Sequence, residues 1–400
     1  MTPPAVILKP GRDKPVRQRH PWVFSGAIAR IQGDPADGDI VEVRDAQGAF
    51  LARGTLNRHS QIVVRLLTWE VDEAIDEGFW RRRLERAIAG RAPLAADPNT
   101  DAYRLVNAES DGLPGLVVDR YGRFLGVQFL TLGIDRRKAL LVALLADLLA
   151  PEGIFERSDV DVREKEGLAP VTGRLGGAEP PPWVGIREHG LRFLVDMRGG
   201  QKTGFYLDQR ENRRVFQQML RALPGAEVLN AFAYTGAFGV YAAAAGAGRI
   251  VHIDSNAEAL ALAREHMALN GFVRRDDEFI VGDVFAELRR FRAAGRRFDA
   301  IVLDPPKFVH SAGQLPRATR GYKDINWLAF QLLRPGGLLF TFSCSGLVTP
   351  DLFQKIVFGA AVDACREAQI IARLSHGPDH PILLSFPEGE YLKGLVCRVL

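Results

Sequence analysis

The run FDAIVLDPPKF, residues 298–308, decides the fold, because an apolar strand pattern stops abruptly at an acid and two prolines. A second run of the same kind, GGLLFTFSCSG at 336–346, follows it along the chain. In an open parallel sheet the carboxyl ends of neighbouring strands form one crevice, in which ligands bind. We therefore expect Asp304 and Cys344 to face the same pocket. A thiol beside a carboxylate suits covalent chemistry on a ring that a thiolate can attack.

Strand-like and helical patterns alternate around these two runs, from about residue 198 to the end of the chain. RIVHID (249–254) reads as a strand and NAEALALAREHMALNG (256–271) as the helix after it. This alternation predicts an α/β class with a doubly wound, Rossmann-like sheet, whose last two strands form an antiparallel hairpin. We interpret 305–321 as a long loop and 322–337 as a helix.

The N-terminal half has a different pattern. Short alternating apolar runs, interrupted by Gly, Pro and Asp, predict a small β-barrel over 1–72. FWRRRLERAIAG (79–90) predicts a linking helix, and further strand patterns around a helix over 134–150 predict a central α+β domain. A polar loop up to Trp183 and a hairpin with Gly190 in its turn should close it. The expected domains are 1–72, 73–195 and 196–400.

Composition limits the possible function classes. The chain has 400 residues, is 47% hydrophobic and carries a net charge of +4. Residues 1–69 contain ten Lys and Arg against six Asp and Glu, which favours a polyanionic partner for that end. Three cysteines without a CxxC pair argue against zinc or a disulfide framework, so we expect no metal. No signal peptide or membrane span is apparent, so we expect a soluble cytoplasmic protein that does not bind membranes.

The turn after the first strand of the α/β sheet, residues 230–236, indicates the cofactor. It lacks GxGxxG, so a nicotinamide-dependent dehydrogenase is poorly supported. Asp254 ends the second strand and suits the ribose hydroxyls of an adenosine-type cofactor, and Asp283 ends the third, where it could accept from an adenine amine. A single acid at such a place often only caps the next helix. Three strand-end acids in series, with Asp304 the third, favour S-adenosylmethionine.

Several longer runs are now recognisable, and they extend over essentially the whole chain. The chain resembles the bacterial large-subunit (23S) ribosomal RNA cytosine-C5 methyltransferases that carry an N-terminal PUA domain. The resemblance implies a PUA-like RNA-binding domain, a central α+β domain and a C-terminal S-adenosylmethionine-dependent methyltransferase domain, with 5-methylcytosine in 23S ribosomal RNA as the product. The runs that carry it include HPWVFSGAI (20–28), KTGFYLDQREN (202–212), NAFAYTGAFG (230–239), DPPKF (304–308), FSCSGLVTPDLFQKI (342–356) and PEGEYLKGLVCRV (387–399).

The resemblance also implies roles for individual residues. Cys344 matches the nucleophile that adds to C6 of the cytosine, and Asp304 matches the catalytic acid. Many RNA cytosine-C5 methyltransferases have a second cysteine, which assists product release, where Lys307 stands here. The group that expels Cys344 or takes the C5 proton is therefore unassigned, although Lys307 could lower the thiol pKa or hold a phosphate. The residues that match the cofactor site are Tyr206, Asp208, Gln209, Arg210, Asn230, Phe232, Tyr234, Thr235, Gly236, Asp254, Asp283 and Asp304.

Contacts with RNA are expected from two segments. Lys307 and Phe308 could hold a phosphate and stack a base, or belong to an ordinary surface loop. His20 and Trp22 are interpreted as packing residues rather than base readers. The PUA-like domain should offer the RNA backbone a basic edge formed by Lys9, Arg12, Lys14, Arg17 and Arg19.

Other interpretations stay open. The rival enzyme is an N-methyltransferase of an adenine or guanine exocyclic amine, because Pro-Pro-aromatic motifs after an acid also serve that chemistry. A rival of another class is a non-catalytic RNA-binding factor. Cys344 could also be a small buried hydrophobe, as Cys365 and Cys397 are expected to be. A homodimer is left open.

Overall fold

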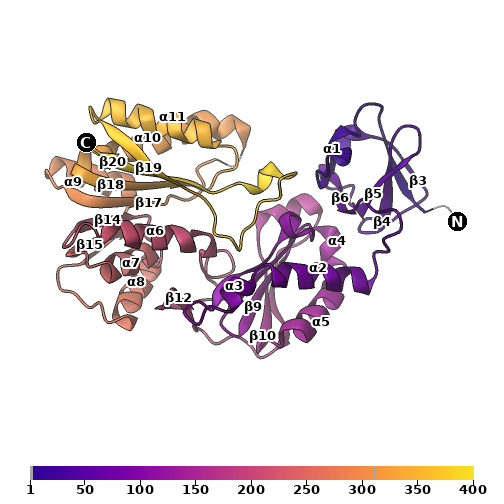
Figure 1. Ribbon diagram of the computed structural model, residues 1–400, viewed down its shortest axis with the longest axis horizontal. Coiled ribbons are helices and arrows are strands. Elements are labelled where there is room, and N and C mark those ends of the chain that lie inside the picture. Colours follow the sequence, from indigo (N-terminus) through magenta and orange to yellow (C-terminus); the bar gives the residue numbers. More distant parts are fainter. Residues whose placement is uncertain (1–2, 310) are drawn as a thin grey trace. The chain divides into compact units, whose positions relative to one another are not determined.

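The computed structural model describes residues 3–309 and 311–400 (Figure 1). They fall into two compact units, so the chain passes between the units several times. Among the described residues, no helix combines the length and the apolar character that crossing a bilayer requires. The first unit is Met1–Arg187 with Val195–Leu207 and Pro378–Gly389, and the second is Glu188–Leu194 with Asp208–Gly377 and Glu390–Leu400.

The N-terminal part of the first unit is a six-stranded sheet in the order β2-β6-β5-β4-β1-β3. The predicted β domain is therefore confirmed. Its core is aliphatic, with Val6, Val43 and Val64 fully buried. The elements are β1 (Ala5–Leu8), α1 (Lys14–Arg17), β2 (Trp22–Phe24), β3 (Ile28–Gln32), β4 (Ile40–Arg44), β5 (Phe50–Leu56) and β6 (Ile62–Thr68).

The central part is a five-stranded sheet in the order β11-β10-β9-β8-β7, against which α2 and α5 pack. Asp76 caps α2 by accepting from Phe79 N, and the buried Phe79, Trp80 and Leu84 give the helix its apolar face. The two-stranded hairpin β12-β13 turns at His189 and Gly190, as predicted. The elements are α2 (Glu77–Ala89), α3 (Ala92–Ala95), β7 (Ala102–Asn107), β8 (Leu116–Tyr121), β9 (Phe124–Phe129), α4 (Leu132–Asp135), α5 (Lys138–Leu149), β10 (Gly153–Ser158), β11 (Val171–Gly177), β12 (Val184–Glu188) and β13 (Leu191–Val195).

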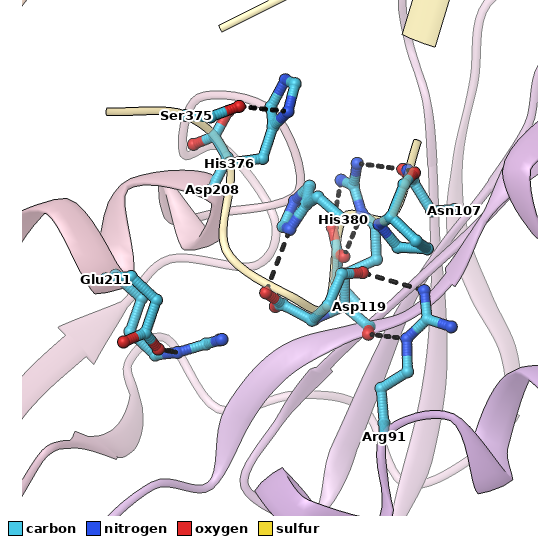
Figure 2. A network of polar contacts seen from close by, with 12 residues as sticks. Arg91, Asn107, Asp119, Asp208, Glu211, Ser375, His376 and His380 are labelled. Carbon is cyan, nitrogen blue, oxygen red and sulfur yellow. Dashed lines mark hydrogen bonds and ion pairs between the residues drawn. The ribbon is translucent and has the colours of Figure 1, made fainter. Parts of the chain in front are cut away.

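Segment Pro378–Gly389 is fastened to this central sheet although it is far away in sequence. Arg91 Nη2 donates to Asp379 O at 2.9 Å, and Asn107 Nδ2 donates to Pro381 O at 3.0 Å (Figure 2). Arg91 also forms a buried bidentate ion pair with Asp111, at 2.8 Å for each nitrogen. The segment is therefore an integral part of the first unit.

The second unit is a seven-stranded sheet in the order β16-β15-β14-β17-β18-β20-β19. The first five strands are parallel, and β20 is antiparallel to both β18 and β19, so the predicted doubly wound sheet and terminal hairpin are confirmed. Helices α9, α10 and α11 cover one face of the sheet, and α6, α7 and α8 cover the other (Figure 1). The elements are α6 (Arg210–Leu220), β14 (Glu227–Ala231), α7 (Ala237–Ala244), β15 (Arg249–Asp254), α8 (Ala257–Leu269), β16 (Glu278–Val281), α9 (Val284–Ala293), β17 (Phe298–Leu303), α10 (Leu315–Leu332), β18 (Leu333–Ser343), α11 (Pro350–Asp363), β19 (Ala368–Leu374) and β20 (Lys393–Val399).

Three sequence predictions about local structure are wrong. Helix α10 begins at Leu315 rather than at 322, because Pro316 is compatible with a first helical turn and Gly321 is accommodated inside the helix. β18 begins at Leu333, so the end of the predicted helix over 322–337 is extended instead. In addition, β11 occupies part of the predicted polar loop before Trp183, as an exposed strand at the edge of the sheet, where it pairs with β10.

Candidate active site

Two neighbouring strands bring Asp304 and Cys344 to one edge of the sheet. β17 and β18 run parallel, with Leu303 opposite Thr341. Asp304 directly follows the end of β17, and Cys344 directly follows Ser343, the last residue of β18. Both side chains are half-buried, so neither is sealed in the core. This is the arrangement in which the carboxyl ends of parallel strands form a ligand site.

Hydrogen bonds from α10 fix the turn that carries Cys344. The Ser343 hydroxyl donates to the Tyr322 hydroxyl at 3.0 Å, and the Ser345 and Tyr322 hydroxyls are 3.4 Å apart. Burial raises the pKa of Tyr322, which keeps it a neutral phenol. Val348 N donates to Ser345 O at 3.1 Å, so the turn closes on itself. The candidate nucleophile therefore lies on a constrained backbone.

Lys393, which no pattern in the sequence singled out, also contacts this turn. Its ammonium donates to Ser345 O at 2.7 Å and to Val348 O at 2.6 Å. The signal in the sequence was a lysine at the start of the final strand, KGLVCRV, immediately before the apolar run GLVC. Burial lowers the pKa of Lys393 to about 8, while the nearby Cys344 and Glu390 oppose that shift.

The predicted cofactor turn has an unusual backbone. Phe232, Tyr234 and Gly236 have φ of 58°, 48° and 75°, which is the left-handed region. Non-glycine residues in this region cost about 1–3 kcal/mol each and concentrate at ligand sites. Asp254 offsets part of this cost, because its Oδ2 accepts from Tyr234 N at 2.7 Å and its Oδ1 accepts from Asn256 N at 2.9 Å. Each carboxylate oxygen can accept a further hydrogen bond, so Asp254 can also take ribose hydroxyls.

Buried contacts of Asn230 and Thr235 hold this turn in place. Asn230 is buried in β14, and its Nδ2 lies 3.3 Å from His252 Nδ1 on the neighbouring strand β15. Thr235 is also buried, and its carbonyl oxygen lies 2.9 Å from His266 Nδ1 of α8. Gly236 starts α7, where an added Cβ would lie only 2.6 Å from Cβ of Ala263. The close approach of two helices therefore requires glycine at this position.

Two other predicted residues have structural contacts of their own. Asp283 is exposed and caps α9 by accepting from Ala286 N at 2.8 Å, which is the alternative role foreseen for a strand-end acid. The Phe308 ring lies 4.7 Å from Tyr322 and 6.4 Å from Phe232. Phe308 thus belongs to an aromatic cluster beside the cofactor turn, while Lys307 is exposed. Their roles toward cofactor and RNA stay predictions.

The segment that precedes the sheet is divided between the two units. In the first unit, the Tyr206 hydroxyl donates to Gln201 Oε1 at 2.5 Å. In the second unit, Asp208, Gln209 and Arg210 are buried at the start of α6. Asp208 Oδ2 accepts from the Tyr391 hydroxyl at 2.7 Å, and Gln209 Oε1 accepts from Asn212 Nδ2 at 2.6 Å. Ser375 Oγ, close to His376 Nδ1 at 3.4 Å, extends the polar contacts around these residues (Figure 2).

The expected basic edge of the N-terminal domain is partly neutralised by the domain's own acids. Arg17 pairs with Asp13 and Asp45, and Arg19 contacts Glu70 and lies over the Trp69 ring. Lys9 Nζ donates to Gly26 O at 3.1 Å. Among the described residues, no hydrogen bond or ion pair engages the side chains of Arg12 and Lys14.

The remaining aromatic and thiol predictions have mixed outcomes. The packing interpretation of Trp22 is confirmed, because its ring contacts Phe386 at 4.7 Å and its Nε1 donates to Glu109 at 2.9 Å. Cys397 is buried, as expected. The expectation that Cys365 is a core residue is wrong: it is exposed, with φ of 53°, because α11 has already ended at Asp363.

Comparisons with known proteins agree with this architecture. The family of PUA-like domains matches residues 6–69, and the family of S-adenosylmethionine-dependent methyltransferases matches 172–392. The chain is 47% identical over 397 residues to "Ribosomal RNA large subunit methyltransferase I" of Klebsiella pneumoniae, covering 99% of this chain and 98% of that protein. It is 52% identical over 394 residues to the protein of the same name from Shewanella amazonensis, covering 98% and 99%.

Solved structures share the fold. A protein described as "a putative methyltransferase complexed with SAH" superposes with a TM-score of 0.86 at 22% identity, over 99% of this chain and 100% of that one. At this identity the likeness extends to the fold alone. Together with the family match, it shows that the second unit is an S-adenosylmethionine-dependent methyltransferase fold.

Proposed function

The chain belongs to the S-adenosylmethionine-dependent methyltransferases that carry a PUA-like domain, among the relatives named ribosomal RNA large subunit methyltransferase I, and we propose that it methylates C5 of a cytosine in 23S ribosomal RNA. The observation that carries the proposal is a half-buried cysteine, Cys344, directly after β18. The acid Asp304 directly follows β17, which is the neighbouring strand. A methyltransferase of exocyclic amines would need no thiol at this place.

Each step of the reaction has a candidate residue. C5 of cytosine is a weak nucleophile, and the Cys344 thiolate raises its electron density by adding to C6. Asp304, protonated, donates to the N3 edge and holds the adduct. S-adenosylmethionine, when bound, supplies an electrophilic methyl group on its sulfonium. Once C5 carries the methyl group, loss of the C5 proton restores the double bond and breaks the C6–S bond, which returns the electron pair to Cys344 as a thiolate.

The cofactor turn fits the donor by its shape and polarity. Its left-handed residues shape the backbone between β14 and α7, and Asp254 retains the capacity to accept from hydroxyls. Asp304 stands next to this turn in the sheet, because β17 pairs with β14. One acid can therefore contact both the target base and the donor.

The base that is methylated can be tested directly. The protein is incubated with labelled S-adenosylmethionine and 23S ribosomal RNA from a strain that lacks the activity, and the nucleosides are separated. We expect label in 5-methylcytosine. Label in an N-methylated purine would establish the rival amine chemistry, and absence of label on naked RNA and on ribosomal particles alike would favour a non-catalytic RNA-binding factor.

A further inference from the structure

Lys393 is buried next to the cysteine turn. Lysine side chains are rarely buried in proteins unless they are paired. Lys393 opens β20 directly opposite Ser343, the residue before Cys344. It is only 5% exposed. Burying an ammonium group is costly unless it is compensated by hydrogen bonds and opposite charge. The surroundings of Lys393 should therefore explain why the charge is kept there.

Two of the three ammonium protons have identified acceptors. They go to the carbonyl oxygens of Ser345 and Val348, so the ammonium spans the turn that begins with Cys344. Ser345 is also held from α10 by Tyr322. Lysine on one side and tyrosine on the other thus fix the backbone that directs the thiol.

Several titratable groups lie near Lys393, including His376, whose Nε2 accepts from Leu392 N at 2.9 Å. Cys344 faces it from the end of β18, and Glu390 faces it from the segment before β20. Tyr322 of α10 faces Cys344 from the other side and stays a neutral phenol. Lys393 is therefore a cation that is hydrogen-bonded directly to the cysteine turn. The exposed Lys307, which the sequence suggested for this task, has no such contact with the turn in the described structure.

Resting on the proposed role of Cys344 as nucleophile, we propose that Lys393 is a positioning residue that fixes the cysteine turn and stabilises the Cys344 thiolate with its charge. A nearby cation increases the thiolate fraction of a cysteine at neutral pH. The same charge favours departure of the sulfur from C6 as a thiolate, because the electron pair of the C6–S bond returns to the sulfur. A second cysteine is then not required for release.

The charge state of Lys393 agrees with this role. Its pKa of about 8 leaves most of the lysine protonated at pH 7. Above pH 8 the ammonium loses its proton, and its stabilising effect on the thiolate is lost with it. The contribution of Lys393 is therefore largest at neutral pH and falls as the solution becomes more alkaline.

Alkylation of Cys344 tests the proposal without RNA or cofactor. The rate of modification by iodoacetamide is measured from pH 5 to pH 10 by mass spectrometry of the Cys344 peptide, in the wild type, Lys393→Met, Lys393→Gln and Lys393→Arg. We expect the midpoint of the rate profile to rise by about one pH unit or more in the Met and Gln variants, because an adjacent opposite charge shifts a pKa by that amount. The Arg variant should stay closer to the wild type.

Two controls make the result specific. Lys355→Met removes an exposed lysine that pairs with Asp351 on α11, and it should leave the profile unchanged. The exposed Cys365 of the same molecules reports any general change in reactivity. If Lys393→Met does not fold, as judged by circular dichroism, Lys393→Gln carries the comparison, since its amide can still donate to a turn carbonyl.

The outcomes separate the two proposals. A wild-type midpoint in folded Lys393→Met or Lys393→Gln would overturn the role of Lys393 and leave the nucleophile untouched. Full methylation activity in Cys344→Ala would reject the nucleophile, whatever the alkylation profile shows.

Discussion

One buried histidine should make the stability of this molecule depend on pH. His252 is fully buried in β15 and stacks on the Phe279 ring at 4.6 Å. Burial, with a smaller effect of Arg264, lowers the pKa of His252 to about 3. Between this value and the ordinary histidine value of 6.5, the unfolded chain binds more protons than the folded one. The free energy of unfolding should therefore fall as the pH is lowered, by up to about 1.4 kcal/mol per pH unit.

The substitution His252→Gln tests this, because glutamine does not titrate. Urea denaturation at a series of pH values between 4 and 7 should give a flatter dependence of the free energy of unfolding than in the wild type. An equally steep dependence in the variant would assign the acid sensitivity to other groups.

The positions of candidate site residues were predictable from the sequence only where a residue directly ends an apolar strand pattern. Asp304 and Cys344 each end an apolar run, so their meeting at one edge follows from the topology of a parallel sheet. Lys393 lies 49 residues beyond Cys344 on an antiparallel strand. Its place opposite Ser343 depends on strand register, which no local pattern reveals.

At the scale of helices and strands, α7 packs closely on β15 because Gly239 of α7 has no side chain. A Cβ added to Gly239 of α7 would lie 2.0 Å from Cε1 of His252. Gly239→Ala should lower the free energy of unfolding by ~1–3 kcal/mol through overpacking, although alanine is the better helix former.

Gly359→Ala is the matched control for that substitution. Gly359 lies inside α11, where an added Cβ would meet only Lys323 Cε at an ordinary 3.5 Å. This variant should gain about 0.5–1 kcal/mol from helix propensity. Chemical denaturation measures the free energy of unfolding of both variants. Equal destabilisation of the two would show that the short distance between Gly239 and His252 is not the cause.

Elements with a strong apolar pattern were predicted well, and those on exposed edges were not. RIVHID predicts β15 with its observed bounds, because every residue after Arg249 is core or a strand-end acid. β11 contains Gly173, Gly176 and Gly177 and buries little, so it resembles a loop in the sequence. It is held as a strand by its pairing with β10, which is a tertiary effect.

At the scale of the whole molecule, buried ion pairs join the N-terminal domain to the central one. Arg65 of β6 pairs with Glu109 at 3.1 Å and with Glu166 at 2.7 Å, and all three are buried. Deleting residues 1–70 would remove this partner from both carboxylates and also uncover the surface of the central domain around them. Truncation is therefore a poor test of RNA binding, and surface substitutions are better.

Neutralising Arg12 and Lys14 together should weaken binding to ribosomal RNA, because neither side chain is neutralised within the described structure. The salt dependence of the affinity should become shallower by about two units in log–log slope, if each cation displaces one counterion. Filter binding at several salt concentrations measures this. Arg17→Ala with Arg19→Ala, whose charges are already paired, should have a smaller effect, and the reverse order would contradict the assignment.

The measurement that tests the central claim most directly is the trapping of the covalent intermediate. In a 23S ribosomal RNA fragment with 5-fluorocytidine in place of cytidine, fluorine at C5 blocks the proton loss that releases the enzyme. With S-adenosylmethionine present, the wild type and Cys365→Ala should form a protein–RNA complex that survives denaturing electrophoresis. Cys344→Ala should form none while still binding S-adenosylhomocysteine. A denaturation-resistant complex in Cys344→Ala, or a crosslink that maps to another residue, would contradict the account.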